Sequence, residues 1–484
     1  MNFTCNAQSK IRMSILSKNS ITGATAILLF IITGLIPYEH HHHHHLRFTA
    51  EGGECIDYEA SENTITVECN ASFLDVVQNI NDPDILENVG DSEYILNANL
   101  EVADDVSFAM TSNQDGLQYL KIIGANGIIV YGKILIYGVK ITSWDFSDED
   151  VIQQNINGTI GRGYVQFAAS EGAEIINSEF GYLGYVEPGR RGFDLLGGGA
   201  PSHDMVIRGS KFHDMWMAFY SRGAYNITVD GNEYYNNIKY ALDPHTGTHD
   251  MNITNNWLHH NPIGAICSDR CHNILIEGNL VEHNADHGIY FSRNMHDSIV
   301  RNNNIYNTTS GITVSESPNN QIYNNTIEGA ILQGIRLFNP DIPDDGLTED
   351  NFVYNNSIID SENGISATRS HDNIVGNTTF SDIESSEYRL SGNSSMMIRG
   401  QYFDSALISD DGSEIGSQIE IASSGIIDVI EGARSDGEED GGDEEEDEDD
   451  DEGDEDEGEG ELYNTYNEPY RKRLSDGDSI TVSS

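Results

Sequence analysis

Residues 252–289 read NITNNWLHHNPIGAICSDRCHNILIEGNLVEHNADHGI and contain one pattern twice. Each copy has an apolar segment led by asparagine, a second asparagine shortly after it, and then a Gly-led apolar segment. The pattern recurs along the chain, mostly at steps of 21 to 25 residues, and its second asparagines are Asn232, Asn256, Asn279, Asn303, Asn325, Asn356 and Asn377. One longer step, between Asn325 and Asn356, contains a loop rich in proline and aspartate.

This period predicts an all-β solenoid. Three short strands separated by turns, in about two dozen residues, make one coil of a parallel β-helix. A propeller blade needs about twice that length, and a leucine-rich repeat needs a leucine scaffold that is missing here. We expect apolar residues to fill the interior and the recurring asparagines to stack as amide ladders between coils. No extended helical period is visible, so long helices are not expected.

The rest of the chain divides by composition. An apolar run, Ile21 to Ile36, follows basic residues and predicts a signal peptide or signal anchor. Six histidines follow at 40–45 and indicate a tag or a solvated spacer. The expected organisation is a leader at 1–38, a His-rich linker at 39–54, the β-helix catalytic domain at 55–430, and an acidic low-complexity segment with the C-terminus at 431–484. Residues from about 380 to 430 are expected to end the stack and cover its exposed edge.

The charge balance restricts the partners. The 25 Lys+Arg and 80 Asp+Glu give a formal net charge of −55, and 20 of the acids lie between Asp436 and Glu461. The remainder is still at about −35 (−55 plus 20), so nucleic acid is not expected as a partner. A polyanionic substrate would need a local cationic site instead. The acidic tail is open to loose divalent-cation binding, but no Gly-Gly-x-Gly-x-Asp array is present, so no cofactor is expected to be required.

Four cysteines follow the leader. In an exported domain this number fits two disulfides, which we expect between Cys55 and Cys69 and between Cys267 and Cys271, although spacing alone does not fix the pairing. Free buried thiols are the alternative. A zinc site is disfavoured, because only Cys267 and Cys271 have a ligand-like spacing.

Charged and titratable residues recur at one position of the repeat. In the turn after the Gly-Ile segment, residues separated by 23, 25, 23 and 23 positions are Arg222, His245, Arg270, Arg293 and Glu316. Stacked coils lie about 4.8 Å apart, so we expect these side chains to form a narrow, largely basic strip on an acidic body. Such a strip fits a binding groove for a uronate polymer. A single arginine here is equally consistent with a partner for the nearby Asp269.

The segment around His245 reads Tyr240-Ala241-Leu242-Asp243-Pro244-His245. It resembles the Tyr-x-x-Asp-Pro-His signature of the mannuronan C-5-epimerases, alginate-modifying enzymes that are right-handed parallel β-helices. The likeness extends over the asparagine-rich coils from about 205 to 380 and includes His287-Gly288-Ile289 with Ser292-Arg293. The resemblance implies a polysaccharide isomerase acting on an anionic sugar polymer.

The resemblance also implies catalytic roles. C-5 epimerisation removes the proton alpha to a sugar carboxylate and returns one to the opposite face. His245 has the pKa range of a suitable base, and Tyr240 is suited to donate the opposite-face proton or to hold water there. Asp243 can orient His245 or bind sugar hydroxyls. A cation must stabilise the charge that develops on the carboxylate. The local sequence favours Arg293 for this role and the coil spacing favours Arg270, so both stay open.

Substrate contacts are expected from Arg222, Arg293, His287 and Asp269. Histidines that recur just before a strand are expected to form a turn-capping ladder rather than a catalytic group; they are His203, His249, His272, His296 and His371.

Three other functions remain open. A polyuronate lyase shares the proton abstraction and then expels the 4-linked sugar. A hydrolase would need two carboxyls with separated pKa values, which neighbouring arginines oppose. A non-catalytic carbohydrate-binding or metal-maturation β-helix is the alternative outside enzymes. We expect an exported monomer that meets a membrane only through an uncleaved N-terminal segment.

Overall fold

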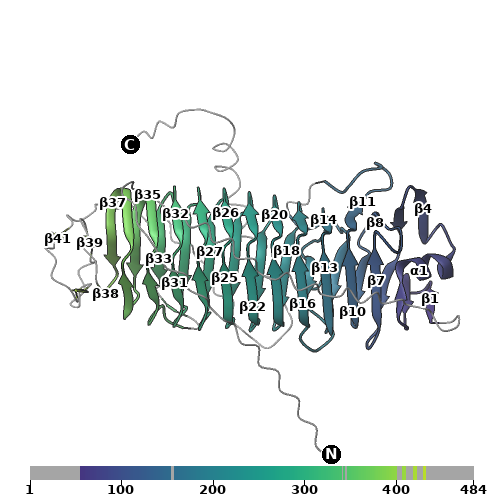
Figure 1. The fold of residues 1–484 in the computed structure, drawn as a ribbon, viewed down its shortest axis with the longest axis horizontal. Coiled ribbons are helices and arrows are strands. Elements are labelled where there is room, and N and C mark those ends of the chain that lie inside the picture. The colour runs from purple at the N-terminus through teal and green to yellow at the C-terminus, as the bar shows by residue number, and fades with distance from the viewer. Residues whose placement is uncertain are drawn as a thin grey trace, which may run out of the picture. The chain divides into compact units, whose positions relative to one another are not determined.

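The computed structural model describes residues 55–153, 157–340, 342–343 and 346–399, and the strand backbones at 406–409, 418–421 and 429–431. Parallel strands follow one another along the described part of residues 48–484, as the successive arrows in Figure 1 show. The predicted leader, the histidine run and the acidic tail lie outside the described residues. Within the described part, no helix has the length and apolar character needed to cross a membrane.

Each coil contributes one strand to each of three ladders, named here in the order in which the chain visits them, and the pairing is parallel except in two antiparallel pairs near the start of the stack. The first ladder forms a 14-stranded sheet. Its strands are β3 (Ala71–Ser72), β7 (Ser107–Thr111), β10 (Lys133–Tyr137), β13 (Gly172–Ile176), β16 (His203–Arg208), β19 (Tyr225–Asp230), β22 (His249–Thr254), β25 (His272–Glu277), β28 (Ile299–Arg301), β31 (Gln321–Tyr323), β34 (Phe352–Tyr354), β36 (Asn373–Gly376), β38 (Ser395–Arg399) and β40 (Gln418–Ile421).

The second ladder consists mostly of three-residue strands. It contains β4 (Leu86–Gly90), β5 (Glu93–Leu96), β8 (Tyr119–Ile123), β11 (Lys140–Trp144), β14 (Glu179–Gly181), β17 (Lys211–His213), β20 (Glu233–Tyr235), β23 (Trp257–His259), β26 (Leu280–Glu282), β29 (Asn304–Tyr306), β32 (Thr326–Glu328) and the first parts of β35 (Ser357–Thr368) and β37 (Thr379–Ser391).

The third ladder carries the predicted motif. It contains β1 (Ile56–Glu59), β2 (Thr64–Val67), β6 (Asn99–Val102), β9 (Gly127–Val130), β12 (Tyr164–Phe167), β15 (Gly192–Leu195), β18 (Met217–Arg222), β21 (Tyr240–His245), β24 (Ile263–Ser268), β27 (His287–Ser292), β30 (Ser310–Ser315), β33 (Gln333–Phe338), the later parts of β35 and β37, β39 (Ala406–Ser409) and β41 (Val429–Glu431).

The register confirms the predicted parallel β-helix. In the first ladder Val229 pairs with Ile253, and Ile253 pairs with Ile276, so each pairing step advances the chain by one period of the sequence repeat. All three side chains are buried in the single large apolar core. Pairing continues in the same parallel sense through β37, β39 and β41, so the predicted closing region from about residue 380 extends the stack in its described strands.

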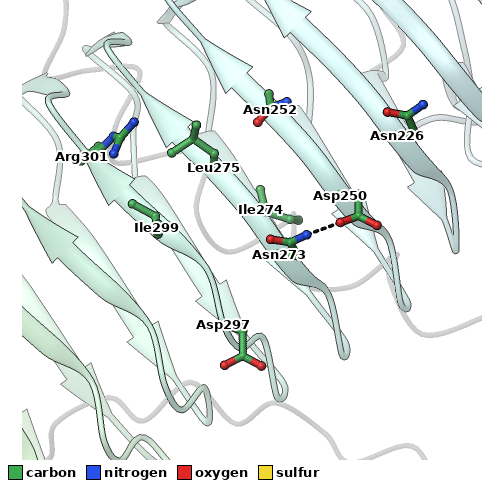
Figure 2. A pocket seen from close by; sticks show the side chains of 9 residues that line it. All are labelled: Asn226, Asp250, Asn252, Asn273, Ile274, Leu275, Asp297, Ile299 and Arg301. Atoms are coloured by element: carbon green, nitrogen blue, oxygen red, sulfur yellow. Dashed lines mark hydrogen bonds between the residues drawn. The ribbon is translucent and has the colours of Figure 1, made fainter.

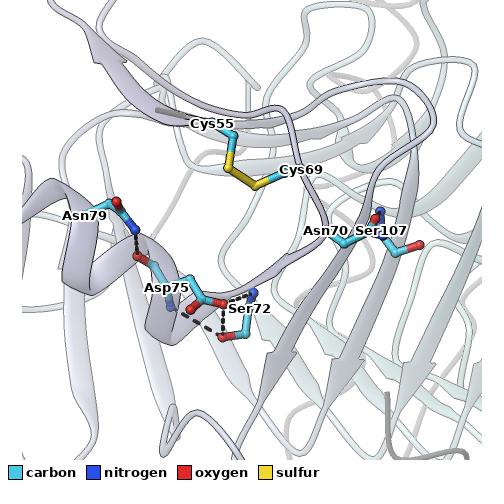
Figure 3. Close-up of a disulfide and its surroundings, with 7 residues drawn as sticks. All are labelled: Cys55, Cys69, Asn70, Ser72, Asp75, Asn79 and Ser107. Atoms are coloured by element: carbon cyan, nitrogen blue, oxygen red, sulfur yellow. Dashed lines mark hydrogen bonds between the residues drawn. A yellow bond between two sulfur atoms is a disulfide. The ribbon is translucent and has the colours of Figure 1, made fainter. Parts of the chain in front are cut away.

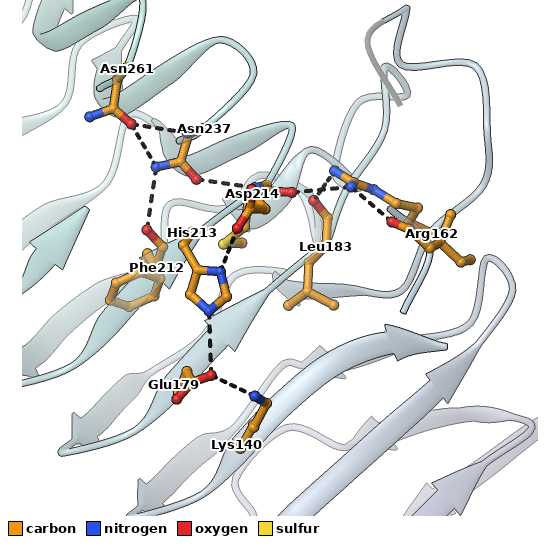
Figure 4. Close-up of polar contacts among 11 residues, drawn as sticks. Lys140, Arg162, Glu179, Leu183, Phe212, His213, Asp214, Asn237 and Asn261 are labelled. Atoms are coloured by element: carbon orange, nitrogen blue, oxygen red, sulfur yellow. Dashed lines mark hydrogen bonds and ion pairs between the residues drawn. The ribbon is translucent and has the colours of Figure 1, made fainter. Parts of the chain in front are cut away.

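Buried asparagines join the coils, as the repeat predicted. The backbone N–H of Asn232 donates to Oδ1 of Asn256 at 2.9 Å, and that of Asn256 donates to Oδ1 of Asn279 at 2.8 Å. Another row of asparagine amides follows the short strands of the second ladder. In it, the backbone N–H of Asn237 donates to Oδ1 of Asn261 at 3.1 Å (Figure 4). These amides satisfy the turn backbone inside the stack, where an unpaired group would be costly.

The recurring glycines have a steric cause. A Cβ on Gly264 would lie 2.5 Å from the carbonyl oxygen of Gly288, and one on Gly288 would lie 2.6 Å from that of Gly311. No side chain fits so close to the next coil, which explains why the second and third residues of these third-ladder strands are Gly-Ala or Gly-Ile.

The first coils carry the helix α1 (Phe73–Ile80), and Ser72 caps it with a capping box closed by Asp75. The predicted disulfide between Cys55 and Cys69 is present beside it, as Figure 3 shows. This bond joins the short antiparallel pair β1–β2 at the start of the stack.

The predicted disulfide between Cys267 and Cys271 is wrong, because both residues are free and buried. Both belong to the apolar core, and the Cys271 thiol donates to the carbonyl oxygen of Ser268 at 2.9 Å. Burial raises the pKa of both thiols. They pack as small apolar side chains.

Candidate active site

Strand β21 presents Asp243 and His245 on its outward side. Leu242 is fully buried in the core. Since side chains alternate along a strand, Asp243 and His245 point away from the core. His245 is half-buried and Asp243 is only 1% exposed. Tyr240, half-buried, begins the strand. The fold thus places all three motif residues on one strand of the third ladder.

The preceding coil supplies a cation and an aromatic ring. In the register of β18 and β21, Tyr220 pairs with Asp243 and Arg222 pairs with His245. The rings of Tyr220 and His245 stack with centroids 5.6 Å apart. Arg222 is exposed, so its charge is available to a ligand beside His245.

Buried charges one coil further back support this row. Asp194 pairs with Tyr220 across β15 and β18, and Arg191 lies over the Tyr220 ring at 4.1 Å from its centroid. The Arg191 Nη1 and Asp194 Oδ2 atoms are 3.8 Å apart, and both side chains are nearly fully buried. The sequence prediction missed all three residues. Their coil is less regular than the repeat, with a register shift between Gly192 and Asp194.

Arg270 is not level with His245. Tyr240 pairs with Ile263, and the same register places Ser268 beside His245. Arg270 follows further along the chain, in a turn where Asp269 and Arg270 both adopt positive φ, 56° and 60°. The single predicted column therefore holds for Arg222 and His245, whereas Arg270 lies beyond it in the turn.

Asp269 connects this turn to His245. Its carboxylate forms an ion pair with Arg270, Oδ1 to Nε 2.7 Å, and accepts a hydrogen bond from the Thr246 side chain. Nδ1 of His245 lies 2.6 Å from the same Thr246 hydroxyl. Burial alone would raise the pKa of Asp269, but the hydrogen bonds from Arg270 and Thr246 and their positive surroundings lower it. The carboxylate is therefore ionised at neutral pH.

His287 lies two coils from Tyr240 in the same ladder. Ala265 pairs with Ile289, which places His287 level with Ile263 and about 10 Å from the row of Tyr240. Its ring centroid lies 4.7 Å from that of Tyr290, and its Nδ1 is 3.0 Å from the Thr313 hydroxyl.

Two further cations border the site. Arg293 is exposed in the turn after β27, and its carbonyl oxygen accepts from the N–H of Arg270 at 2.8 Å. The arginines left open by the sequence therefore lie in adjacent coils. Lys239, nearly buried, was not predicted; its Nζ lies 6.0 Å from the Tyr240 ring centroid and 5.5 Å from that of Trp216. Its position directly before Tyr240 is the sequence feature from which its place in the site could have been predicted.

Other polar groups lie on different ladders. A surface hollow on the first ladder is shown in Figure 2, and its lining residues are Asn226, Asp250, Asn252, Asn273, Ile274, Leu275, Asp297, Ile299 and Arg301. The predicted histidine ladder runs beside it, with centroids 4.8 Å apart for His249 and His272 and 5.2 Å for His272 and His296. Among the described residues, no group of three or more His, Cys, Asp or Glu side chains is placed to hold a metal ion.

The fold of this protein is similar to that of known proteins. The family model described as "Right handed beta helix region" matches residues 124–305 and 192–342. The periplasmic alginate epimerase AlgG superposes with a TM-score of 0.54 at 19% identity, covering 76% of this chain and 85% of that chain. One of its point variants gives 0.57 at 20% identity over the same shares. This protein is a right-handed parallel β-helix.

Sequence comparison then points to particular enzymes. A mannuronan C5-epimerase of Pseudomonas putida is 27% identical over 136 residues, which are 26% of this chain and 26% of that protein. The matched part thus spans about a quarter of the curated relative. The resemblance to the mannuronan C-5-epimerases, inferred from the segment Tyr240 to His245, is confirmed.

Proposed function

We propose that this protein is a polysaccharide-modifying enzyme that epimerises uronate residues at C-5, of the mannuronate-to-guluronate type. One observation carries the proposal: Tyr240, Asp243 and His245 lie on one strand, and the exposed Arg222 is level with His245. A proton donor, a carboxylate, an imidazole and a cation are the groups that proton transfer alpha to a carboxylate requires.

His245 is assigned as the base that removes the C-5 proton. Asp269 is ionised and accepts the Thr246 O–H, so the Thr246 oxygen accepts from the Nδ1–H of His245. This order of donors fixes the tautomer with its lone pair on Nε2, the atom that takes the proton. Asp269 and Thr246 thereby position the base, a role that the sequence did not assign to them.

The electron pair left at C-5 delocalises into the carboxylate, where a guanidinium stabilises it. Arg270 already shares its charge with Asp269, whereas Arg293 has no carboxylate within ion-pair distance among the described residues. Both remain candidates. Tyr240 then delivers a proton to the opposite face of C-5, which completes the inversion without breaking the glycosidic bond.

The experiment is proton NMR of polymannuronate incubated with the full chain in D2O. We expect deuterium at C-5 and new guluronate-type signals. His245→Asn should abolish both. The control is His249→Asn, which changes one of the stacked histidines on the first ladder and should leave both signals unchanged. Unsaturated chain ends would identify a lyase instead. No reaction of polymannuronate, polyguluronate or polygalacturonate would refute the enzymatic assignment and favour a carbohydrate-binding role.

The remaining assignments follow from the substrate. A polymeric sugar acid lies outside the cytoplasm, which fits an exported protein with a disulfide between Cys55 and Cys69. The proton transfers use only side chains of this chain, so we propose that no cofactor is required. We further propose that it acts as a monomer, a point that gel filtration tests directly.

A further inference from the structure

The cations of this acidic protein are paired differently on its three ladders. On the first and second ladders five cations are neutralised by carboxylates at 2.7 to 3.1 Å; these pairs are Lys121–Glu93, Lys140–Glu179, Lys211–Glu233, Arg208–Asp230 and Arg301–Glu277. Among the described residues, the exposed or half-exposed arginines without a carboxylate at ion-pair distance are Arg222, Arg293, Arg336, Arg389 and Arg399.

Four of these five arginines lie on one side of the molecule. Arg222, Arg336 and Arg389 belong to third-ladder strands, and Arg293 is in the turn that follows β27. This is the ladder that presents Tyr240 and His245. A chain with more than three acids for each base thus has four of the five unneutralised arginines of its described part on the side of the proposed active site.

Arg336 and its neighbours form a defined group at the far end of this row. Arg336 and Phe338 alternate with the buried Leu337 on β33, so they point outward. The guanidinium carbons of Arg336 and Arg369 lie 4.1 and 5.3 Å from the Phe338 ring centroid. Nε of Arg369 donates to the carbonyl oxygen of Asn339 at 2.7 Å. Phe338 therefore holds two like charges beside one ring.

The distance from His245 suits a polymer. Four pairing steps separate β21 from β33, through β24, β27 and β30. At about 4.8 Å per step this is roughly 19 Å. A single sugar bound at His245 cannot reach that far, whereas an extended chain of several sugars can. Arg293 lies between the two positions and continues the positive row.

We infer that Arg336, Phe338 and Arg369 form a second, non-catalytic subsite that binds carboxylates of a polyuronate several sugar units away from the reacting one. The inference rests on the proposed function. It adds a reason why the protein would bind a long polymer more tightly than a short oligomer. Guanidinium groups suit this ligand because they bind carboxylates through two parallel hydrogen bonds. The phenyl ring restricts the two side chains in advance, which reduces the entropy that binding costs.

The test is calorimetric titration of the full chain with long polymannuronate and with a mannuronate trisaccharide. Arg336→Gln should weaken binding of the polymer about tenfold and leave binding of the trisaccharide unchanged. Arg336→Lys, which keeps the charge, should restore part of the loss. Arg208→Gln, which removes an arginine already paired with Asp230 on the first ladder, is the matched control and should change neither affinity.

Three results would overturn the subsite: unchanged polymer affinity in Arg336→Gln, an equal loss for the trisaccharide, or no binding of any polyuronate to the unsubstituted chain. Failure of the proposed function gives a different result. If the polymer binds, Arg336→Gln weakens it and no deuterium enters C-5, then the subsite is supported and the epimerase assignment is refuted.

Discussion

The charged chain of Lys140, Glu179, His213 and Asp214 on the second ladder gives a quantitative prediction (Figure 4). Nε2 of His213 lies 3.4 Å from Glu179, and its Nδ1 lies 2.8 Å from Asp214. The hydrogen bond from His213 lowers the pKa of Glu179 from 4.5 to about 2, aided by Lys140 and opposed by burial. Burial alone would lower the pKa of His213, but Asp214 and Glu179 raise it above 6.5.

The perturbation is Glu179→Gln, which keeps the size and removes the charge. A change in pKa from 4.5 to about 2 corresponds to about 3.4 kcal/mol. The Glu179 side chain is 35% exposed, so solvent screening reduces this figure to about 2 kcal/mol, shared between His213 and Lys140. We therefore expect a loss of about 2 kcal/mol in the free energy of unfolding at pH 6.

The pH dependence has a definite sign. The pKa of His213 is raised on folding, so its contribution is complete below about pH 6.5 and is lost as the pH rises through the folded-state pKa. The contribution of Glu179, whose pKa is lowered, is complete above about pH 4.5 and is lost towards pH 2. At pH 9 the Glu179→Gln loss should therefore fall to about 1 kcal/mol, because only the Lys140 pair remains.

Urea unfolding at pH 6 and pH 9, followed by circular dichroism, measures both values. Glu277→Gln is the control, since Glu277 pairs with Arg301 at 2.7 Å and no histidine takes part in that pair. Its effect should be the same at both pH values. An identical Glu179→Gln loss at pH 6 and pH 9, or an equal pH dependence in the control, would refute the reasoning.

Four further predictions concern other sites. Thr246→Val should reduce C-5 deuterium exchange about tenfold, because the His245 Nδ1 loses its acceptor; an unchanged rate contradicts the proposed relay. Tyr234→Phe should leave stability unchanged or raise it by about 1 kcal/mol, since the fully buried hydroxyl has no hydrogen-bond partner among the described residues; a thermal melt checks this, and a clear loss would argue against it. Removing the Cys55–Cys69 disulfide, which closes a separation of 14 residues, should cost about 3 kcal/mol, measured in melts with and without reductant. A thiol reagent should label the two other described cysteines only after unfolding, and rapid labelling of the native protein would contradict their burial.

Most of the fold could be predicted from the sequence repeat. Asn256 and Asn279 occupy equivalent positions because each amide satisfies backbone of a neighbouring coil, so the spacing alone reveals the stacking. The motif residues Tyr240, Asp243 and His245 were predictable for the same reason, since they share one strand. By contrast, the disulfide expected between Cys267 and Cys271 failed because side-chain direction decides pairing, and a close spacing in sequence does not.

The positions of the site residues depend on the conformation of individual turns, which the spacing of the sequence repeat does not reveal. The sequence distance from His245 to Arg270 exceeds one pairing step between β21 and β24, and the positive-φ residues Asp269 and Arg270 absorb the difference. That displacement leaves Arg270 out of the row of His245, whereas the unshifted register places Asp269 level with Thr246. The sequence by itself determined the solenoid, the motif strand and the acidic body. Only the tertiary structure decided which side chains meet across coils, because strand register is fixed by backbone pairing whereas each turn sets its own length and direction.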